Sequence, residues 1–139
     1  MIYYIADNHF GHKNVIRFDN RPFADTVLMD EVLVHNWNER VTEDDTVYIL
    51  GDCFWKNEEN SVKLIQRLKG HKHLIRGNHD RVHGRLRFYY ESIEHYAEIN
   101  DNDRLVILCH YPIPFYKNQH YGAVMLYGHV HNTREQDFI

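Results

Sequence analysis

Cysteines, prolines and long apolar runs are scarce in this sequence, and their scarcity excludes several classes of protein. The two cysteines, Cys53 and Cys109, have a spacing that fits neither a disulfide framework nor a cysteine metal site. The 139 residues include three prolines, and no repeat, linker or low-complexity stretch is present. No apolar stretch is long enough to cross a bilayer, and the first strand-like segment begins at Ile2. We therefore expect no signal peptide and a cytoplasmic protein.

Positive charge is also in short supply. Lys and Arg number 16 against 20 Asp and Glu, which gives a net charge of −4. A broad basic surface for nucleic acid or anionic membrane is therefore not expected. A substrate with one or two phosphates stays compatible, because bound divalent metals reverse the sign of a site locally. With 43% hydrophobic and 26% charged residues, the chain is expected to form one globular domain over residues 1–139.

Strand-like and helix-like segments alternate in the first half of the chain. The segments that predict strands are residues 2–6, 46–50, 73–75, 93–99, 104–109 and 123–127. Residues 26–40 predict a helix with Thr26 as its N-cap, and a second helix is predicted to begin at Asn60 or Ser61 and to stop at Gly70. The two late segments around the polar turn 100–103 predict a hairpin. This order indicates an α/β fold with mixed sheets covered by helices.

Polar side chains of the metal-binding type follow the ends of the predicted strands. The fragments are Asp7-Asn8-His9, Gly51-Asp52, Gly77-Asn78-His79-Asp80, His110 and Gly128-His129-Val130-His131. Ligands of α/β proteins gather outside the carboxyl ends of strands, so these fragments can converge on one site. Together they supply three carboxylates, an Asn amide and five imidazoles, which are the donors of a two-metal hydrolytic centre.

The order of these fragments, from residue 7 to residue 131, resembles that of the calcineurin-like metallophosphoesterase superfamily. The segment Phe10-Gly11-His12-Lys13-Asn14, together with Arg21-Pro22-Phe23, further resembles its small bacterial and phage branch. The resemblance implies a four-layer α-β-β-α sandwich, with two mixed sheets face to face and helices outside. More strand usually follows the last fragment in that superfamily, whereas eight residues follow His131 here.

The resemblance also implies roles for individual residues. One divalent metal is expected on Asp7, His9, Asp52 and His131. The second is expected on Asp52, Asn78, His110 and His129, so Asp52 would bridge the two ions. His79 is expected to protonate the leaving group, with Asp80 as its orienting partner. The mixed N and O donors suit Mn²⁺ best, with Fe, Zn²⁺ or Ni²⁺ as alternatives.

The predicted function is therefore hydrolysis of a phosphate ester by a cytoplasmic dinuclear metallophosphoesterase. A phosphodiester is favoured over a monoester, because no evident capping insertion closes the site. A metal-dependent nuclease and a metal-binding scaffold of the same fold without turnover are the competing interpretations. His12, Arg76 and Tyr111 are either further site residues or ordinary packing residues.

Overall fold

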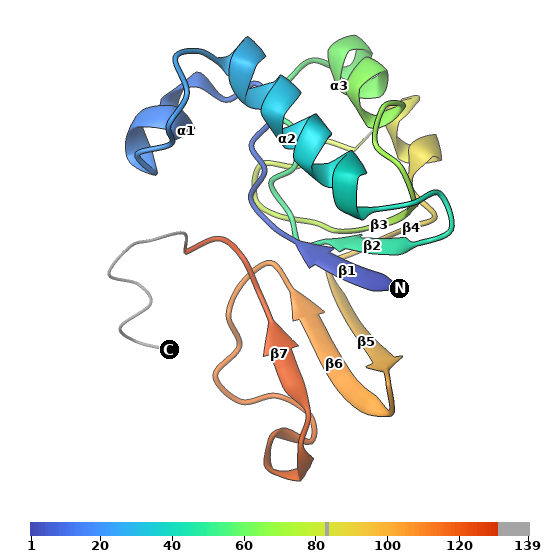
Figure 1. Ribbon diagram of the computed structural model, residues 1–139. Helices are drawn as coiled ribbons and strands as arrows, with labels where there is room; N and C mark the ends of the chain where they lie inside the picture. Colours follow the sequence, from blue (N-terminus) through green and yellow to red (C-terminus); the bar gives the residue numbers. More distant parts are fainter. Residues whose placement is uncertain (83, 131–139) are drawn as a thin grey trace.

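Two β-sheets and a set of helices form the part of the chain that the structure describes. The structure is a computed structural model, and it describes residues 1–82 and 84–130 (Figure 1). In chain order the elements are β1 (Ile2–Ile5), α1 (Lys13–Phe18), α2 (Thr26–Arg40), β2 (Thr46–Ile49), α3 (Glu58–Ile65), β3 (His71–Ile75), the 3₁₀ helix η1 (Leu86–Tyr89), β4 (Ser92–Glu94), β5 (Tyr96–Asp101), β6 (Arg104–Cys109), the 3₁₀ helix η2 (Gln119–Tyr121) and β7 (Val124–Leu126).

The two sheets differ in strand direction. The first has the order β1-β2-β3-β4 and is parallel throughout, because helical segments carry the chain back between its early strands. The second has the order β5-β6-β7, with β5 antiparallel and β7 parallel to β6. The prediction of an α/β fold is confirmed, and the prediction that both sheets are mixed is wrong for the first sheet.

The predicted strand 93–99 is two strands in the structure. β4 pairs with β3 in the parallel sheet, the chain bends at His95, and β5 pairs with β6 in the second sheet. The predicted hairpin around residues 100–103 is present between β5 and β6. The sequence pattern is strand-like on both sides of His95, so it does not reveal that the chain changes sheets there.

Both long helices begin earlier than predicted. The N-cap of α2 is Asp25, whose carboxylate accepts a hydrogen bond from Leu28 N–H (2.8 Å). The N-cap of α3 is Asn57, whose side chain accepts from Asn60 N–H (2.9 Å). A carboxylate or amide oxygen satisfies a free N–H of the first turn better than the predicted caps do from inside the helix.

The sheets and helices are stacked in layers around two cores. Figure 1 shows α2 and α3 on one side of the parallel sheet and the second sheet on its other side. Alternation along β2 supplies both cores. Val47 and Ile49 belong to the core on the helical side, whereas Tyr48 and, just after the strand, Leu50 belong to the core shared with the second sheet. Within the described ranges, α1 to α3 are the α-helices, and none of them lies beyond the second sheet. None of them is long and apolar enough to cross a membrane.

The carboxyl ends of strands from both sheets meet at one edge of the molecule. Asp7 N–H donates to the Gly51 carbonyl (3.1 Å), which joins the segments after β1 and β2. Gly128 N–H donates to the His110 carbonyl (2.9 Å), which joins the segments after β7 and β6. This edge carries the polar fragments.

Candidate metal centre

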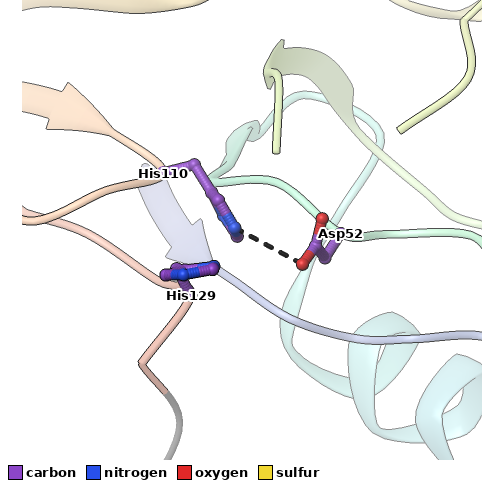
Figure 2. Close-up of side chains that lie close together, drawn as sticks. All are labelled: Asp52, His110 and His129. Carbon is purple, nitrogen blue, oxygen red and sulfur yellow. Dashed lines mark ion pairs between the residues drawn. The ribbon is translucent and has the colours of Figure 1, made fainter. Parts of the chain in front are cut away.

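Two groups of metal-ligand side chains share one carboxylate at this edge. The first group is Asp52, His110 and His129, and the second is Asp7, His9 and Asp52. In each group, one ligand atom from every residue lies within 4.8 Å of the others. Figure 2 shows His110 pointing at Asp52, with His129 beside them. Two groups that share Asp52 are the arrangement that a bridged pair of cations requires.

His110 is fully buried, and its hydrogen bonds fix which nitrogen faces the site. Its Nδ1 lies 2.8 Å from the carbonyl oxygen of Leu50, which can only accept, so Nδ1 carries the hydrogen. Its Nε2 then faces Asn78 Oδ1 at 3.0 Å and Asp52 Oδ2 at 3.3 Å. A backbone carbonyl orients metal-binding imidazoles in this way in many sites. Three atoms with lone pairs, His110 Nε2, Asn78 Oδ1 and Asp52 Oδ2, therefore converge here. A proton or a cation shared between them stabilises this arrangement.

The ionisation of Asp52 and His110 is coupled. Burial alone would raise the pKa of Asp52, but hydrogen bonds from His110 and from the backbone N–H of His79 (2.9 Å) outweigh it and hold that pKa below its usual value. Burial alone would lower the pKa of His110, but Asp52 and the Leu50 carbonyl outweigh it and raise that pKa. The pair therefore favours an ionised carboxylate beside an imidazole that keeps its second proton to a higher pH than usual.

The second group lies on the segment that follows β1. Both carboxylate oxygens of Asp7 accept from the His129 N–H, at 3.2 and 3.0 Å, which ties this segment to the end of β7. His9 Nδ1 is hydrogen-bonded to His12 Nδ1 (2.8 Å). The other nitrogen of His9, Nε2, lies 3.7 Å from Asp52 Oδ2 and 4.0 Å from Asp7 Oδ1. His12 therefore orients His9 so that Nε2 faces the shared carboxylate.

Four candidate ligands have left-handed backbone conformations. The φ angles are +54° for Asp7, +53° for His9, +51° for Asp52 and +72° for His129. The other non-glycine residues with positive φ in the described ranges are all Asn or Asp, and positive φ is uncommon for non-glycine residues even though Asn, Asp and His are enriched there. Such a conformation costs about 1–3 kcal/mol per residue and persists mainly where function requires it.

Three glycines leave room for the donor atoms. They are Gly51, Gly77 and Gly128. A Cβ at these positions would lie 2.4 Å from His110 Nδ1, 2.4 Å from Asp52 Oδ1 and 2.7 Å from Asp7 Oδ2, respectively. All three distances are too short for a real contact, so each glycine is required by the packing of a candidate ligand against the backbone.

The predicted role of Asp80 as the orienting partner of His79 is wrong in this structure. The Asp80 carboxylate accepts hydrogen bonds from the backbone N–H groups of Gly77 (2.7 Å), Asp52 (2.8 Å) and Cys53 (3.1 Å), and it forms no hydrogen bond or ion pair with the His79 ring. Burial raises the pKa of Asp80, and the three N–H donors partly offset this. Asp80 therefore joins the turns after β2 and β3 and so positions Asp52.

His79 lies on the exposed side of the centre. Asn78 Nδ2 donates to His79 Nε2 (3.0 Å), and the indole of Trp55 lies 4.2 Å from the His79 ring. Trp55 also stacks on the ring of His12, with ring centroids 3.7 Å apart, and on that of His9 at 5.7 Å. Burial and the nearby His79 lower the pKa of His12. Trp55 therefore connects the orienting partner of His9 with the candidate acid.

A cleft of about 400 Å³ begins beside His79. It lies between α3, η1 and the turns after β2 and β3, and its lining includes Trp55, Asn78 and His79. Lys56 lines it as well but is engaged by the buried Asp30 (2.9 Å). Arg81, two residues after His79, is exposed, and no ion pair in the described ranges engages it. Within the described part of the chain, the cleft therefore offers a positive charge without an ion-pair partner next to the centre.

The structure brings most of the sequence-predicted ligands together. The residues around the shared carboxylate are Asp7, His9, Asp52, Asn78, His110 and His129. His131 lies outside the described residues. Of the residues with two open interpretations, His12 contacts His9, Tyr111 packs 4.8 Å from the His129 ring, and Arg76 donates to the Asp80 carbonyl (3.3 Å).

Sequence reasoning missed two contributors to this region. Trp55 belongs to no sequence motif that would mark it as a site residue. Its contacts with the rings of His12 and His79 arise only from the tertiary structure. Arg21 stood out only as part of the Arg21-Pro22-Phe23 resemblance. In the structure its guanidinium contacts the backbone that carries Asp7.

Comparisons with known proteins give a family without a stated activity. No family model matches the chain. The chain is 35% identical to the uncharacterized protein MJ1445 of Methanocaldococcus jannaschii over 139 residues, which cover 99% of this chain and 73% of that protein. It belongs to the same family as MJ1445.

A phage protein and a solved structure are also similar. The gene 66 protein of Mycobacterium phage L5 is 38% identical over 85 residues, which cover 58% of this chain and 40% of that protein. The crystal structure of AQ665 from Aquifex aeolicus, a protein of unknown function, matches with a TM-score of 0.76 and 28% identity over 97% of this chain and 81% of that chain. The names of these relatives state no activity, so the chemistry of the site carries the functional conclusion.

Proposed function

We propose that this protein is a dinuclear metal-dependent phosphoesterase of the calcineurin-like superfamily. The main support is that two groups of ligand-type side chains share Asp52 at the carboxyl ends of strands from both sheets. The left-handed conformations of four candidate ligands and the glycines packed against the donor atoms add to this support. Strained backbone lowers the stability of the fold, and it is found mainly at functional sites such as ligand-binding sites.

The donor set fits two divalent cations. Asp7, His9 and Asp52 would hold one ion, and Asp52, Asn78, His110 and His129 would hold the other. Mixed oxygen and imidazole donors suit Mn²⁺ best, with Fe, Zn²⁺ or Ni²⁺ as alternatives. When bound, the ions would supply Lewis acidity and a nucleophile at neutral pH. Asp80 holds the shared carboxylate between them through three backbone hydrogen bonds.

His79 is the proposed general acid. It is exposed on the side of the centre that opens into the cleft, where a departing group has access to solvent. Asn78 and Trp55 hold its ring, so it does not need Asp80 for orientation. An imidazole placed there can protonate an alkoxide as it leaves.

A phosphodiester is the proposed substrate class. In an in-line displacement the leaving group departs opposite the nucleophile, and the cleft beside His79 provides about 400 Å³ for a substantial organic group. A monoester has such a leaving group too, so the preference for a diester rests on the lack of a capping insertion in the described ranges, which leaves room for the second ester arm. The exposed Arg81 favours a leaving group that carries negative charge of its own.

The four-layer sandwich of the superfamily is part of this proposal. Three layers are arranged as that architecture requires, with helices, the parallel sheet and the second sheet in order. The fourth layer of that architecture would be helical and lie on the outer face of the second sheet, where no helix of the described residues lies.

Hydrolysis assays with Mn²⁺ test the proposal. The protein should hydrolyse bis(4-nitrophenyl) phosphate in the presence of Mn²⁺ and lose this activity with EDTA, and Asp52→Asn should be inactive. Faster turnover of 4-nitrophenyl phosphate than of the diester would overturn the diester preference. Preferential cleavage of a single-stranded oligonucleotide would favour the nuclease. A protein that binds Mn²⁺ without hydrolysing any of these esters would be a metal-binding scaffold instead.

A further inference from the structure

Arg21 contacts the backbone of the segment that carries two candidate ligands. Its Nη1 donates to the Asn8 carbonyl and its Nη2 donates to the Asp7 carbonyl, both at 2.7 Å. The side chain is 17% exposed, and Asp19 Oδ2 lies 3.5 Å from Nη2. One planar guanidinium thus engages two successive carbonyls through two different nitrogens.

The backbone carbonyls that Arg21 contacts lie outside the regular hydrogen bonding of β1. Asp7 and His9 both have positive φ, as does Gly11 two residues later. Carbonyls in such a segment turn away from the regular ladder of β1, so they need other hydrogen-bond donors. The N–H groups of the segment are bonded to the turn after β2, with His9 N–H donating to the Asp52 carbonyl (3.0 Å). Arg21 supplies the matching donors on the opposite, carbonyl side.

We propose that Arg21 is a positioning residue for one metal of the pair, the ion held by Asp7 and His9. The inference rests on the proposed metal centre. The second group depends less on Arg21, because His110 is fixed by the Leu50 carbonyl and Asp52 by the backbone and Asp80. Its third member, His129, is tied to Asp7 through its backbone N–H. Loss of Arg21 should therefore weaken the site at Asp7 and His9 more than the site at His110 and His129.

Substitutions of Arg21 differ in whether they keep its positive charge and its two hydrogen bonds. Lysine has one nitrogen and cannot span both carbonyls with the fixed geometry of a guanidinium. Arg21→Lys should thus keep the charge near Asp19 and part of the positioning. Arg21→Ala removes both hydrogen bonds. Arg17 is exposed on α1 and has no side-chain partner in the described ranges, so Arg17→Ala is the matched control for loss of one arginine nearby.

Mn²⁺ binding to the full chain, measured by calorimetry with Mn²⁺ alone, tests the inference. Wild type and Arg17→Ala should bind two ions. In Arg21→Ala the site at Asp7 and His9 should weaken by roughly 10–100-fold, the usual effect of losing a residue that orients metal ligands, and the other site should weaken less. Arg21→Lys should fall between. Anomalous scattering from Mn²⁺-soaked crystals should place the weakened ion at Asp7 and His9, and Asp7→Asn should affect the same ion.

The possible failures are distinguishable. Two unchanged sites in Arg21→Ala would overturn the inference and leave the metal centre intact. Equal weakening of both sites, or a larger weakening at His110 and His129, would also overturn it, because Arg21 would then affect the stability of the whole fold and not the position of one ligand pair. A wild-type protein that binds no second ion would instead contradict the proposed function. If Arg21→Ala does not fold by circular dichroism, Arg21→Lys decides between the same outcomes.

Discussion

Replacing Gly77 by alanine should disable the centre although the added group is one methyl. The new Cβ would lie 2.4 Å from Asp52 Oδ1, 2.8 Å from Asp52 N and 3.0 Å from His110 Cε1. The φ of Gly77 is not in the left-handed region, so the effect comes from contact and not from backbone strain. Because the Asp52 backbone is also in the way, rotation of the carboxylate alone does not relieve the contact.

The size of the effect follows from the displacement required. Restoring ordinary contact moves the Asp52 carboxylate and the methyl apart by about 1 Å, and a misplacement of that size costs about 10²-fold in rate. Overpacking a well-packed site costs about 1–3 kcal/mol of stability. Both metal ions should bind more weakly, because Asp52 belongs to both groups.

Three measurements on one pair of variants check this reasoning. Gly77→Ala and Gly122→Ala are compared for Mn²⁺ affinity, for hydrolysis of bis(4-nitrophenyl) phosphate and for thermal unfolding. Gly122 has a φ of +90° and nothing within 4 Å of its added Cβ, so its substitution should lower stability and leave metal binding and rate alone. Wild-type affinity and rate in Gly77→Ala would refute the packing of Gly77 against the bridging carboxylate.

Three further predictions concern the acid, the proton and the cleft. His79→Asn should keep both ions while turnover falls by roughly 10²–10⁴, with a smaller loss for nitrophenyl than for alkyl leaving groups; equal losses would rule out a general acid. The affinity for Mn²⁺ should rise with pH above about 6.5, because the raised pKa of His110 keeps a competing proton on the imidazole to higher pH, and an affinity independent of pH would contradict this. Arg81→Ala should raise KM by a factor of about two to five for a diester with an anionic leaving group and leave KM for bis(4-nitrophenyl) phosphate unchanged.

The sequence was sufficient to find the residues at the strand ends. Parallel strands end at one edge of a sheet, so Asp7, Asp52 and Asn78 could be placed together from the order of short apolar runs alone. His110 and His129 could be added to this group because β6 and β7 are parallel and end at the same edge of the second sheet. Local pattern and one topological rule were enough for this part of the site.

Other features depend on tertiary contacts that local pattern does not encode. Asp80 looked like the partner of His79 because they are neighbours in sequence, yet its carboxylate turns toward three backbone N–H groups. The change of sheet at His95 follows from which strand is available for pairing. The contact of Arg21 with the Asp7 carbonyl spans 14 positions, and nothing in the intervening residues predicts it.

Anomalous scattering from crystals grown with Mn²⁺ tests the dinuclear centre most directly. Wild-type protein should show two peaks, one beside Asp7 and His9 and one beside His110 and His129, with Asp52 between them. Asp52→Asn should lose at least one peak, because an amide is a poor bridge between two cations. A single peak in the wild-type protein, or none at millimolar Mn²⁺, would contradict the proposed two-metal centre.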